Sequence, residues 1–164
     1  MEVVARHLQQ EAIKRSIAAE QDYFGRSAFN RYYYATFLEV KQVLGSLRPE
    51  WAGNLAHASI PEMLRGRVVD ELKRGRRQAQ RLSDWEVASL CEKGIAAAID
   101  LARLMEEGRA IRTTADYHPE VRVEFSGKIG FKLNAVSVEM AQAWPHRARA
   151  FLEVTANAWR QIDE

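Results

Sequence analysis

The sequence predicts an all-α fold, an up-down bundle of four to five helices with a small β-hairpin inserted before the last helix. Over most of the chain, apolar residues recur every three or four positions, the period of a helix with one buried face. The stretch 121–133 instead alternates apolar and polar residues, as a strand does. A chain of 164 residues with 47% hydrophobic residues suits a single domain over 1–164.

The first two helices are predicted by apolar spacing. The first is expected over 4–19 and should end near Gly25, and the second is expected over 27–44, with Gly45 as its stop. Apolar residues of the second helix form a stripe and continue onto its other side, so this helix should be central and buried. The stripe consists of Phe29, Tyr33, Phe37, Val40 and Leu44.

The next two helices are predicted by the capping-box pattern Ser-x-x-Glu, which satisfies free backbone N–H groups at a helix start. The pattern occurs at Ser59 and again at Ser83. Helices are therefore expected over 60–75 and 84–107. Gly108 is expected to end the second of them.

The hairpin and the last helix complete the predicted bundle. Apolar residues alternate with polar ones at Val121, Val123 and Phe125 and again at Ile129, Phe131 and Leu133. The hairpin is open to three roles: capping a site, extending a dimer interface or meeting a partner. Ser137 is expected to cap a last helix that reaches about Ile162, and Pro145 should kink or divide it.

Composition narrows the function classes. The single cysteine, Cys91, leaves no internal disulfide and no thiolate cluster for zinc, which favours a reducing, cytoplasmic compartment. Neither a signal peptide nor a membrane-spanning run is expected. The sequence has no Walker loop, dinucleotide fingerprint, HExxH pair or GxSxG elbow, and its four histidines are scattered, so neither a cofactor nor a metal is expected.

A segment of the second predicted helix follows the pattern S-R-x-Y-Y-A-x-F, with asparagine in place of the serine. Its residues are Asn30, Arg31, Tyr33, Tyr34, Ala35 and Phe37, preceded by Tyr23, Phe24 and Arg26. In this segment the chain resembles the HEPN superfamily, whose smaller prokaryotic members carry the pattern. Because an aromatic stripe at helical spacing is more often core than site, the segment indicates a fold rather than an activity.

A second stretch carries the functional part of the resemblance. Arg112 is followed by His118 with five residues between them, and Thr113 is polar. Active HEPN proteins carry an Arg followed four to six residues later by His, near the start of the last major helix. The resemblance thus implies a metal-independent ribonuclease, with the pair lying between the fourth helix and the last.

The chemistry explains why these residue types are needed. Metal-free RNA cleavage requires a base for the 2′-hydroxyl, an acid for the leaving 5′-oxygen and a fixed cation near the phosphate. Imidazole serves either proton role near neutral pH, and arginine stabilises the phosphoryl oxygens. Because one chain offers one histidine there, the resemblance implies a homodimer with a composite site.

The same stretch supports an alternative. Ala115, Asp116 and Tyr117 complete an R-x-x-A-D-Y pattern that resembles HEPN proteins presumed not to cleave RNA. That resemblance implies a non-catalytic protein whose partner is, for example, a small nucleotidyltransferase in a toxin-antitoxin or defence unit. On a purely structural interpretation, Arg112 pairs with Asp116 across a turn and His118 is a surface residue.

A basic segment is the other candidate for RNA binding. Its cations are Arg65, Arg67, Lys73, Arg74, Arg76, Arg77 and Arg81. They could follow a phosphate backbone, with Arg74, Arg76 and Arg77 at their centre. They equally suit a solvated helix end, where cations complement the helix dipole.

Overall fold

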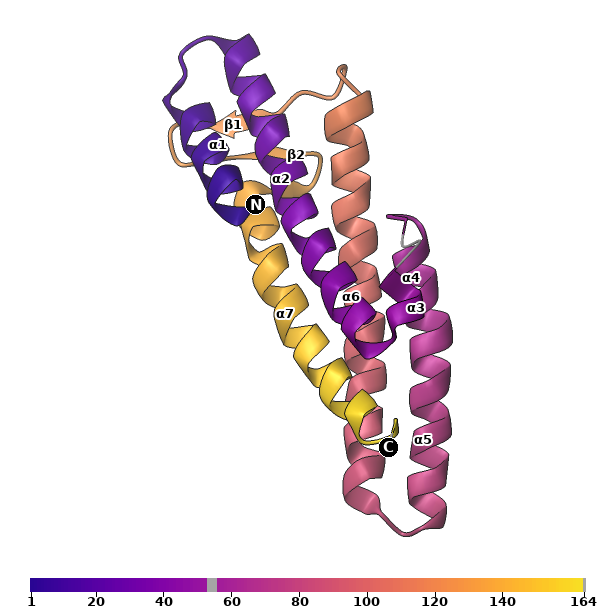
Figure 1. Cartoon of the computed structure of the whole chain (residues 1–164). Coiled ribbons are helices and arrows are strands. Elements are labelled where there is room, and N and C mark those ends of the chain that lie inside the picture. The colour runs from indigo at the N-terminus through magenta and orange to yellow at the C-terminus, as the bar shows by residue number, and fades with distance from the viewer. Residues whose placement is uncertain (53–55, 164) are drawn as a thin grey trace. The chain divides into compact units, whose positions relative to one another are not determined.

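The computed structural model describes residues 1–52 and 56–163 and is mostly helical with a small antiparallel sheet (Figure 1). The predicted helical class is therefore confirmed. The helices are α1 (Glu2–Lys14), α2 (Ala18–Leu47), α3 (Pro49–Ala52), α4 (Ser59–Met63), α5 (Val69–Arg81), α6 (Trp85–Tyr117) and α7 (Val138–Arg160), with a π-helical turn, η1 (Leu64–Val68), between α4 and α5. The strands are β1 (Glu124–Ser126), β2 (Gly130–Leu133) and β3 (Val136–Ser137).

The chain divides into two compact units. The first unit comprises Met1–Leu38 and Glu107–His146, and the second comprises Glu39–Glu106 and Arg147–Glu164. The long helices α2, α6 and α7 each contribute residues to both units. In the described part of the chain, no helix combines the length and the apolar character needed to cross a lipid bilayer.

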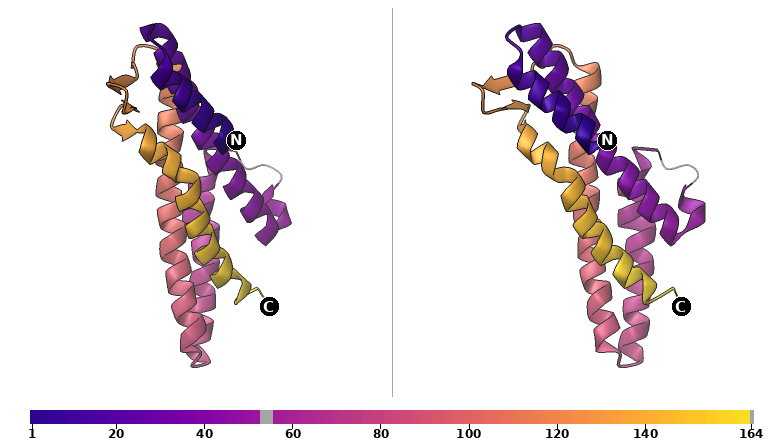
Figure 2. Two further views of the ribbon diagram at one scale, coloured as in Figure 1. Left: turned by 90° about the vertical axis from the view of Figure 1, so that its left-hand side faces the viewer. Right: turned by 60° about the vertical axis from the view of Figure 1, so that its left-hand side comes forward.

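The first unit is built on the aromatic face of α2. The views in Figure 2 show α1 folded back along the first half of α2. The ring of Phe29 meets that of Phe131 edge-on, with centroids 5.7 Å apart, so the sheet packs on this helix. Tyr33 is buried, and burial raises the pKa of its phenol to about 12. Most of the predicted stripe is therefore core, as its spacing indicated.

The second unit has its own apolar core. Its largest buried side chains include Leu44, Ile60, Leu64, Leu72, Leu101, Met105 and Trp159. Trp159 packs edge-on against Trp51, with ring centroids 5.0 Å apart. A Cβ at Gly94 would lie 2.5 Å from the Cβ of Ala158, so the backbone of α6 packs directly against a side chain of α7 there.

The predicted boundary between the first two helices is wrong. The break falls at 15–17, and α2 runs through Gly25, Ser27 and Gly45 without interruption. The break is held by the Gln21 amide, which donates to the Arg15 carbonyl at 2.9 Å. Gly25 is needed for another reason, since a Cβ there would lie 3.1 Å from Val123 beside the sheet.

The two predicted capping boxes are also wrong. Ser59 is the first residue of α4, and its hydroxyl donates to the carbonyl of Ala56 instead of capping. Ser83 has a positive φ of 59°, and the start of α6 is capped one residue later, where Asp84 accepts from the N–H of Val87 at 3.0 Å. Aspartate is as good a cap as serine, so the sequence offered two neighbouring choices.

The prediction ends the third and fourth helices earlier than the structure does. Helix α5 continues through Gly75 to Arg81, and α6 continues through Gly108 to Tyr117. A Cβ at Gly108 would lie 2.9 Å from a ring carbon of Tyr33. The glycine therefore allows a close helix contact and does not end the helix.

The predicted hairpin is part of a three-stranded sheet. Strand β1 pairs antiparallel with β2, with Phe125 opposite Phe131, and β2 pairs with β3, with Leu133 opposite Val136. Ser137 caps α7 as predicted, since its hydroxyl accepts from the N–H of Met140 at 3.2 Å. Pro145 lies inside α7 and does not divide it.

Candidate functional site

The predicted site residues lie at the C-terminal end of α6. Arg112, Thr113, Asp116 and Tyr117 occupy its last turns, and the N–H of His118 still donates to the Thr114 carbonyl at 3.1 Å. The prediction of a link between two helices is therefore wrong for all but the histidine. Helix α6 has these extra turns because it continues through Gly108.

Arg112 is held on one face of α6. Its Nε lies 2.7 Å from Oδ2 of Asp116, although the N–H does not point at that oxygen, so the contact is an ion pair rather than a directed hydrogen bond. The guanidinium also lies over the rings of Tyr34 and Tyr117, at 5.9 and 5.4 Å. Partial burial disfavours its charge, but Asp116 and the two phenols outweigh burial and raise the pKa of Arg112.

Asp116 joins the two motif segments. Besides its ion pair with Arg112, it accepts from the side-chain amide of Asn30, with 2.5 Å between Nδ2 and Oδ1. Asn30 is the residue that replaces serine in the pattern on α2. The replacement is therefore accompanied by a direct contact with α6.

His118 lies immediately beyond the helix with a half-exposed imidazole. Its Nδ1 lies 2.9 Å from Oε1 of Glu120. The backbone N–H of Glu120 and the imidazole lower the pKa of this carboxylate. A carboxylate at Nδ1 favours the tautomer with the proton there, which leaves Nε2 as a proton acceptor open to solvent.

Arg112 and His118 of one chain have different partners. Arg112 shares its face of α6 with Asp116, one turn away, and its guanidinium lies over the ring of Tyr117. His118 lies beyond the helix and contacts Glu120.

A buried arginine that was not among the predicted site residues organises this end of α6. The guanidinium of Arg26 donates to backbone carbonyls of Thr114, Ala115, His118, Pro119 and Val121. Asp22 holds the Nε of Arg26 at 2.9 Å and accepts from the N–H of Val123 at 2.8 Å. The spacing of Asp22 and Arg26, one helical turn, was the available sequence signal.

The charge of Asp22 is stabilised by these donors. Burial alone would raise the pKa of its carboxyl, but the Val123 N–H and the Arg26 guanidinium outweigh burial and lower it. The pair is therefore ionised at neutral pH. It fixes the backbone on both sides of His118.

An open depression of about 290 Å³ lies beside the motif. Its lining is mostly polar and includes one exposed cation, the guanidinium of Arg31. The lining residues are Tyr23, Arg26, Ser27, Asn30, Arg31, Ala115 and Asp116. The two motif segments thus share a surface that can accept a polar ligand.

The basic segment spans η1 and α5 in the second unit. Arg74 pairs with Glu71 at 2.7 Å, and Arg65 pairs with Glu106. Arg76 is half-buried, and Arg77 is exposed with no ion pair to any residue that the structure describes. The segment is thus partly neutralised within its own unit.

Two further findings bear on the site. In the described ranges, 1–52 and 56–163, no three His, Cys, Asp or Glu side chains come together as metal ligands. Comparison with models of protein families, with characterised proteins and with solved structures finds no match.

Proposed function

We propose that the chain is a HEPN-type, metal-independent endoribonuclease that acts as a homodimer in a toxin-antitoxin or defence context. The observation that carries the proposal is the environment of His118. Its Nδ1 faces Glu120 at 2.9 Å, and its backbone carbonyl accepts from Arg26 at 3.1 Å. A histidine oriented by a carboxylate on a fixed backbone is suited to proton transfer.

In the proposed reaction, Nε2 of His118 accepts the proton of the RNA 2′-hydroxyl. The 2′-oxygen attacks phosphorus and the bond to the 5′-oxygen breaks, giving a 2′,3′-cyclic phosphate. A protonated histidine returns a proton to the leaving 5′-oxygen, which becomes a hydroxyl. Arg112 stabilises the charge that builds on the phosphoryl oxygens, with Thr113 beside it.

The need for two proton-transfer groups supports the homodimer. One chain offers one histidine beside Arg112, whereas the reaction needs both a base and an acid. A two-fold axis near the end of α6 would bring Arg112 of one copy toward His118 of the other, and would supply the second histidine.

The first test is RNA cleavage in EDTA by the full chain and by His118→Ala. Loss of a general acid-base group should slow cleavage by about 100- to 10,000-fold. His7→Ala is the matched control, because His7 is an exposed histidine of the same unit. Unchanged cleavage by His118→Ala would remove this histidine from the mechanism.

The second test addresses the composite site. Wild-type chain and a threefold excess of His118→Ala are unfolded together and refolded. If each site needs both histidines, only about one dimer in sixteen stays active, against about one quarter of the activity for independent chains. Activity at the one-quarter level would contradict a shared site.

A second candidate function is favoured by the contacts of Arg112. Its Nε is paired with Asp116, which Asn30 also binds, so part of its charge is already balanced within the chain. A non-catalytic HEPN protein that binds a small nucleotidyltransferase would need no free cation there. Two results together would support this second function. The chain shows no RNA cleavage, and it copurifies with a nucleotidyltransferase encoded next to its gene.

A further inference from the structure

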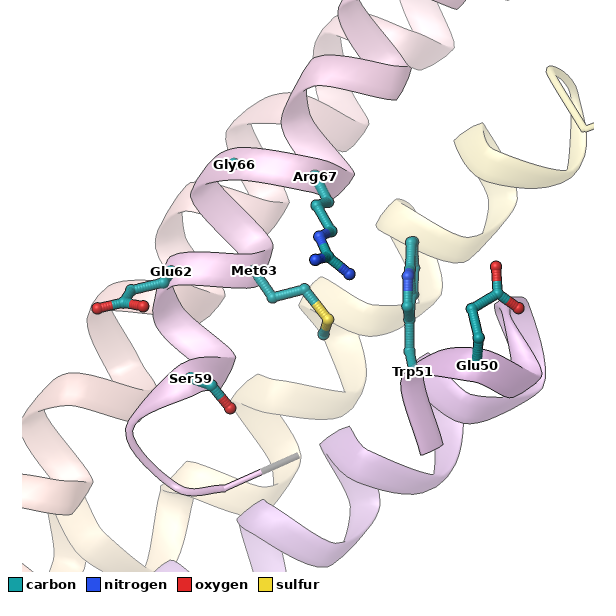
Figure 3. Close-up of a pocket in the computed structure, with 7 residues that line it drawn as sticks. All are labelled: Glu50, Trp51, Ser59, Glu62, Met63, Gly66 and Arg67. Atoms are coloured by element: carbon teal, nitrogen blue, oxygen red, sulfur yellow. The ribbon is translucent and has the colours of Figure 1, made fainter. Parts of the chain in front are cut away.

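The second unit contains a cavity of about 380 Å³, open to solvent, between α3 and the α4–η1 segment (Figure 3). Its volume lies in the range of small-molecule sites, about 300–1,000 Å³. Trp51 forms one wall, and Met63, Gly66 and Arg67 lie on the facing helix. None of these residues takes part in the proposed ribonuclease site.

Gly66 is the first unusual feature of this cavity. A Cβ placed at Gly25, Gly75, Gly94 or Gly108 would lie within 3.1 Å of a neighbouring side chain, so close packing explains these helical glycines. A Cβ at Gly66 would meet no atom within 4 Å. A glycine inside a helix costs about 1 kcal/mol relative to alanine. Packing within the chain does not account for this cost, whereas space kept for a ligand does.

The backbone at the same place is the second feature. Gly66 is the middle residue of η1, where the N–H of Val69 donates to the carbonyl of Leu64, five residues earlier. π-Helical turns are rare and occur frequently at functional sites. The widened turn and the unexplained glycine coincide on one wall of the cavity.

The third feature is a cation directed into the cavity. Figure 3 shows the Arg67 guanidinium and the Met63 thioether turned toward the space in front of Trp51. Among the described residues none forms an ion pair with Arg67. Glu50 lies 3.7 Å from Arg48, which also pairs with Asp163, and the Glu62 carboxylate points away from the cavity.

We propose that this cavity binds a small planar anion, an aromatic ring that carries a carboxylate or a phosphate. The Arg67 guanidinium donates to the anionic oxygens, which suit its planar fork. The ring lies between Met63 and Trp51, a thioether and an indole that offer polarisable apolar surface. Gly66 lies one turn after Glu62, and its lack of a side chain keeps that edge of the cavity open.

The test is calorimetric titration of the full chain with adenosine 5′-monophosphate and, separately, with benzoate. We expect at least one to bind with a dissociation constant of about 1 mM or tighter. Adenosine without phosphate and phosphate without a ring should bind at least about tenfold more weakly. Binding of the nucleotide alone identifies a phosphate ligand, and binding of benzoate alone a carboxylate, either result supporting the proposal.

Two variants locate the binding. Arg67→Gln should weaken it at least about tenfold, and Gly66→Leu, which places a bulky side chain at the edge of the cavity, should weaken it as well. Arg147→Gln is the matched control, because Arg147 is an exposed arginine of the same unit that does not line the cavity. Circular dichroism verifies that each variant is folded.

Two outcomes would overturn the proposal. One is the absence of binding of either compound at about 5 mM. The other is binding that both Arg67→Gln and Gly66→Leu leave unchanged, which would place it elsewhere, for example at the proposed ribonuclease site. Loss of RNA cleavage in His118→Ala has no bearing on either outcome, so the two proposals fail separately.

Discussion

Asp22 and Arg26 form an ion pair one turn apart on α2, with 2.9 Å between Oδ2 and Nε. Only 5% of Asp22 and 9% of Arg26 are exposed. The two Nη groups of the guanidinium donate to backbone carbonyls at the end of α6 and in the segment that follows it. The pair therefore takes the place of a helix C-cap and also positions the backbone of His118.

Arg26→Gln should destabilise the protein by about 3–5 kcal/mol, because it leaves the buried Asp22 carboxylate without its partner. Urea unfolding followed by circular dichroism measures the change. Hydrogen exchange should show lost protection first at 114–121, where the carbonyls lose their donor. The control is Arg122→Gln, since Arg122 contacts the same carboxylate from an exposed position. Arg122→Gln should lower the unfolding free energy by no more than about 1 kcal/mol. An equal loss in both variants would contradict the role of Arg26.

The same pair predicts a dependence on pH. The pKa of Asp22 is lowered from its ordinary value of 3.8. Its stabilising contribution is therefore fully present above about pH 4 and is lost as pH falls through the folded-state pKa. The difference in unfolding free energy between wild type and Asp22→Asn should be larger at pH 7 than at pH 3. A difference that stays constant would show that the charge of Asp22 contributes nothing.

The sequence predicted those features that depend on local spacing. The aromatic stripe of α2, the start of α6 and the cap at Ser137 were predicted from periodicity and capping chemistry. The Arg112–Asp116 ion pair followed from their separation by one turn. The contacts of Arg26 could not be predicted in this way, because its acceptors are carbonyls about ninety residues away in the chain.

Glycine caused most of the boundary errors. A glycine that ends a helix and one that allows a close contact look alike in sequence, and only the distant partner distinguishes them. Gly25 meets Val123 and Gly108 meets Tyr33, partners that periodicity does not reveal. The actual break, at 15–17, contains neither glycine nor proline. A side-chain bond from Gln21 stabilises it instead.

Gly108→Ala therefore should destabilise the protein although alanine is the better helix former. Its Cβ would lie 2.9 Å from a Tyr33 ring carbon and 3.6 Å from Trp144, and neither ring has room to move. We expect a loss of about 1–3 kcal/mol in urea unfolding. Gly66→Ala is the control, because it meets no neighbour and should gain roughly 0.5–1 kcal/mol. Stabilisation by both changes would show that Gly108 is not a packing requirement.

Ser83→Gly should stabilise the protein. Ser83 has a φ of 59° at the end of α5, where the N–H of Asp84 donates to the Ala79 carbonyl at 2.8 Å and that of Ser83 to Gln80 at 3.2 Å. This bond pattern is a Schellman motif, whose left-handed position favours glycine because a Cβ costs about 1–2 kcal/mol there. Part of that gain is offset by the greater freedom of glycine in the unfolded chain, so we expect about 1 kcal/mol and a higher melting temperature. Ser89→Gly, an exposed position inside α6, should lower the melting temperature, and a fall in both variants would contradict strain at Ser83.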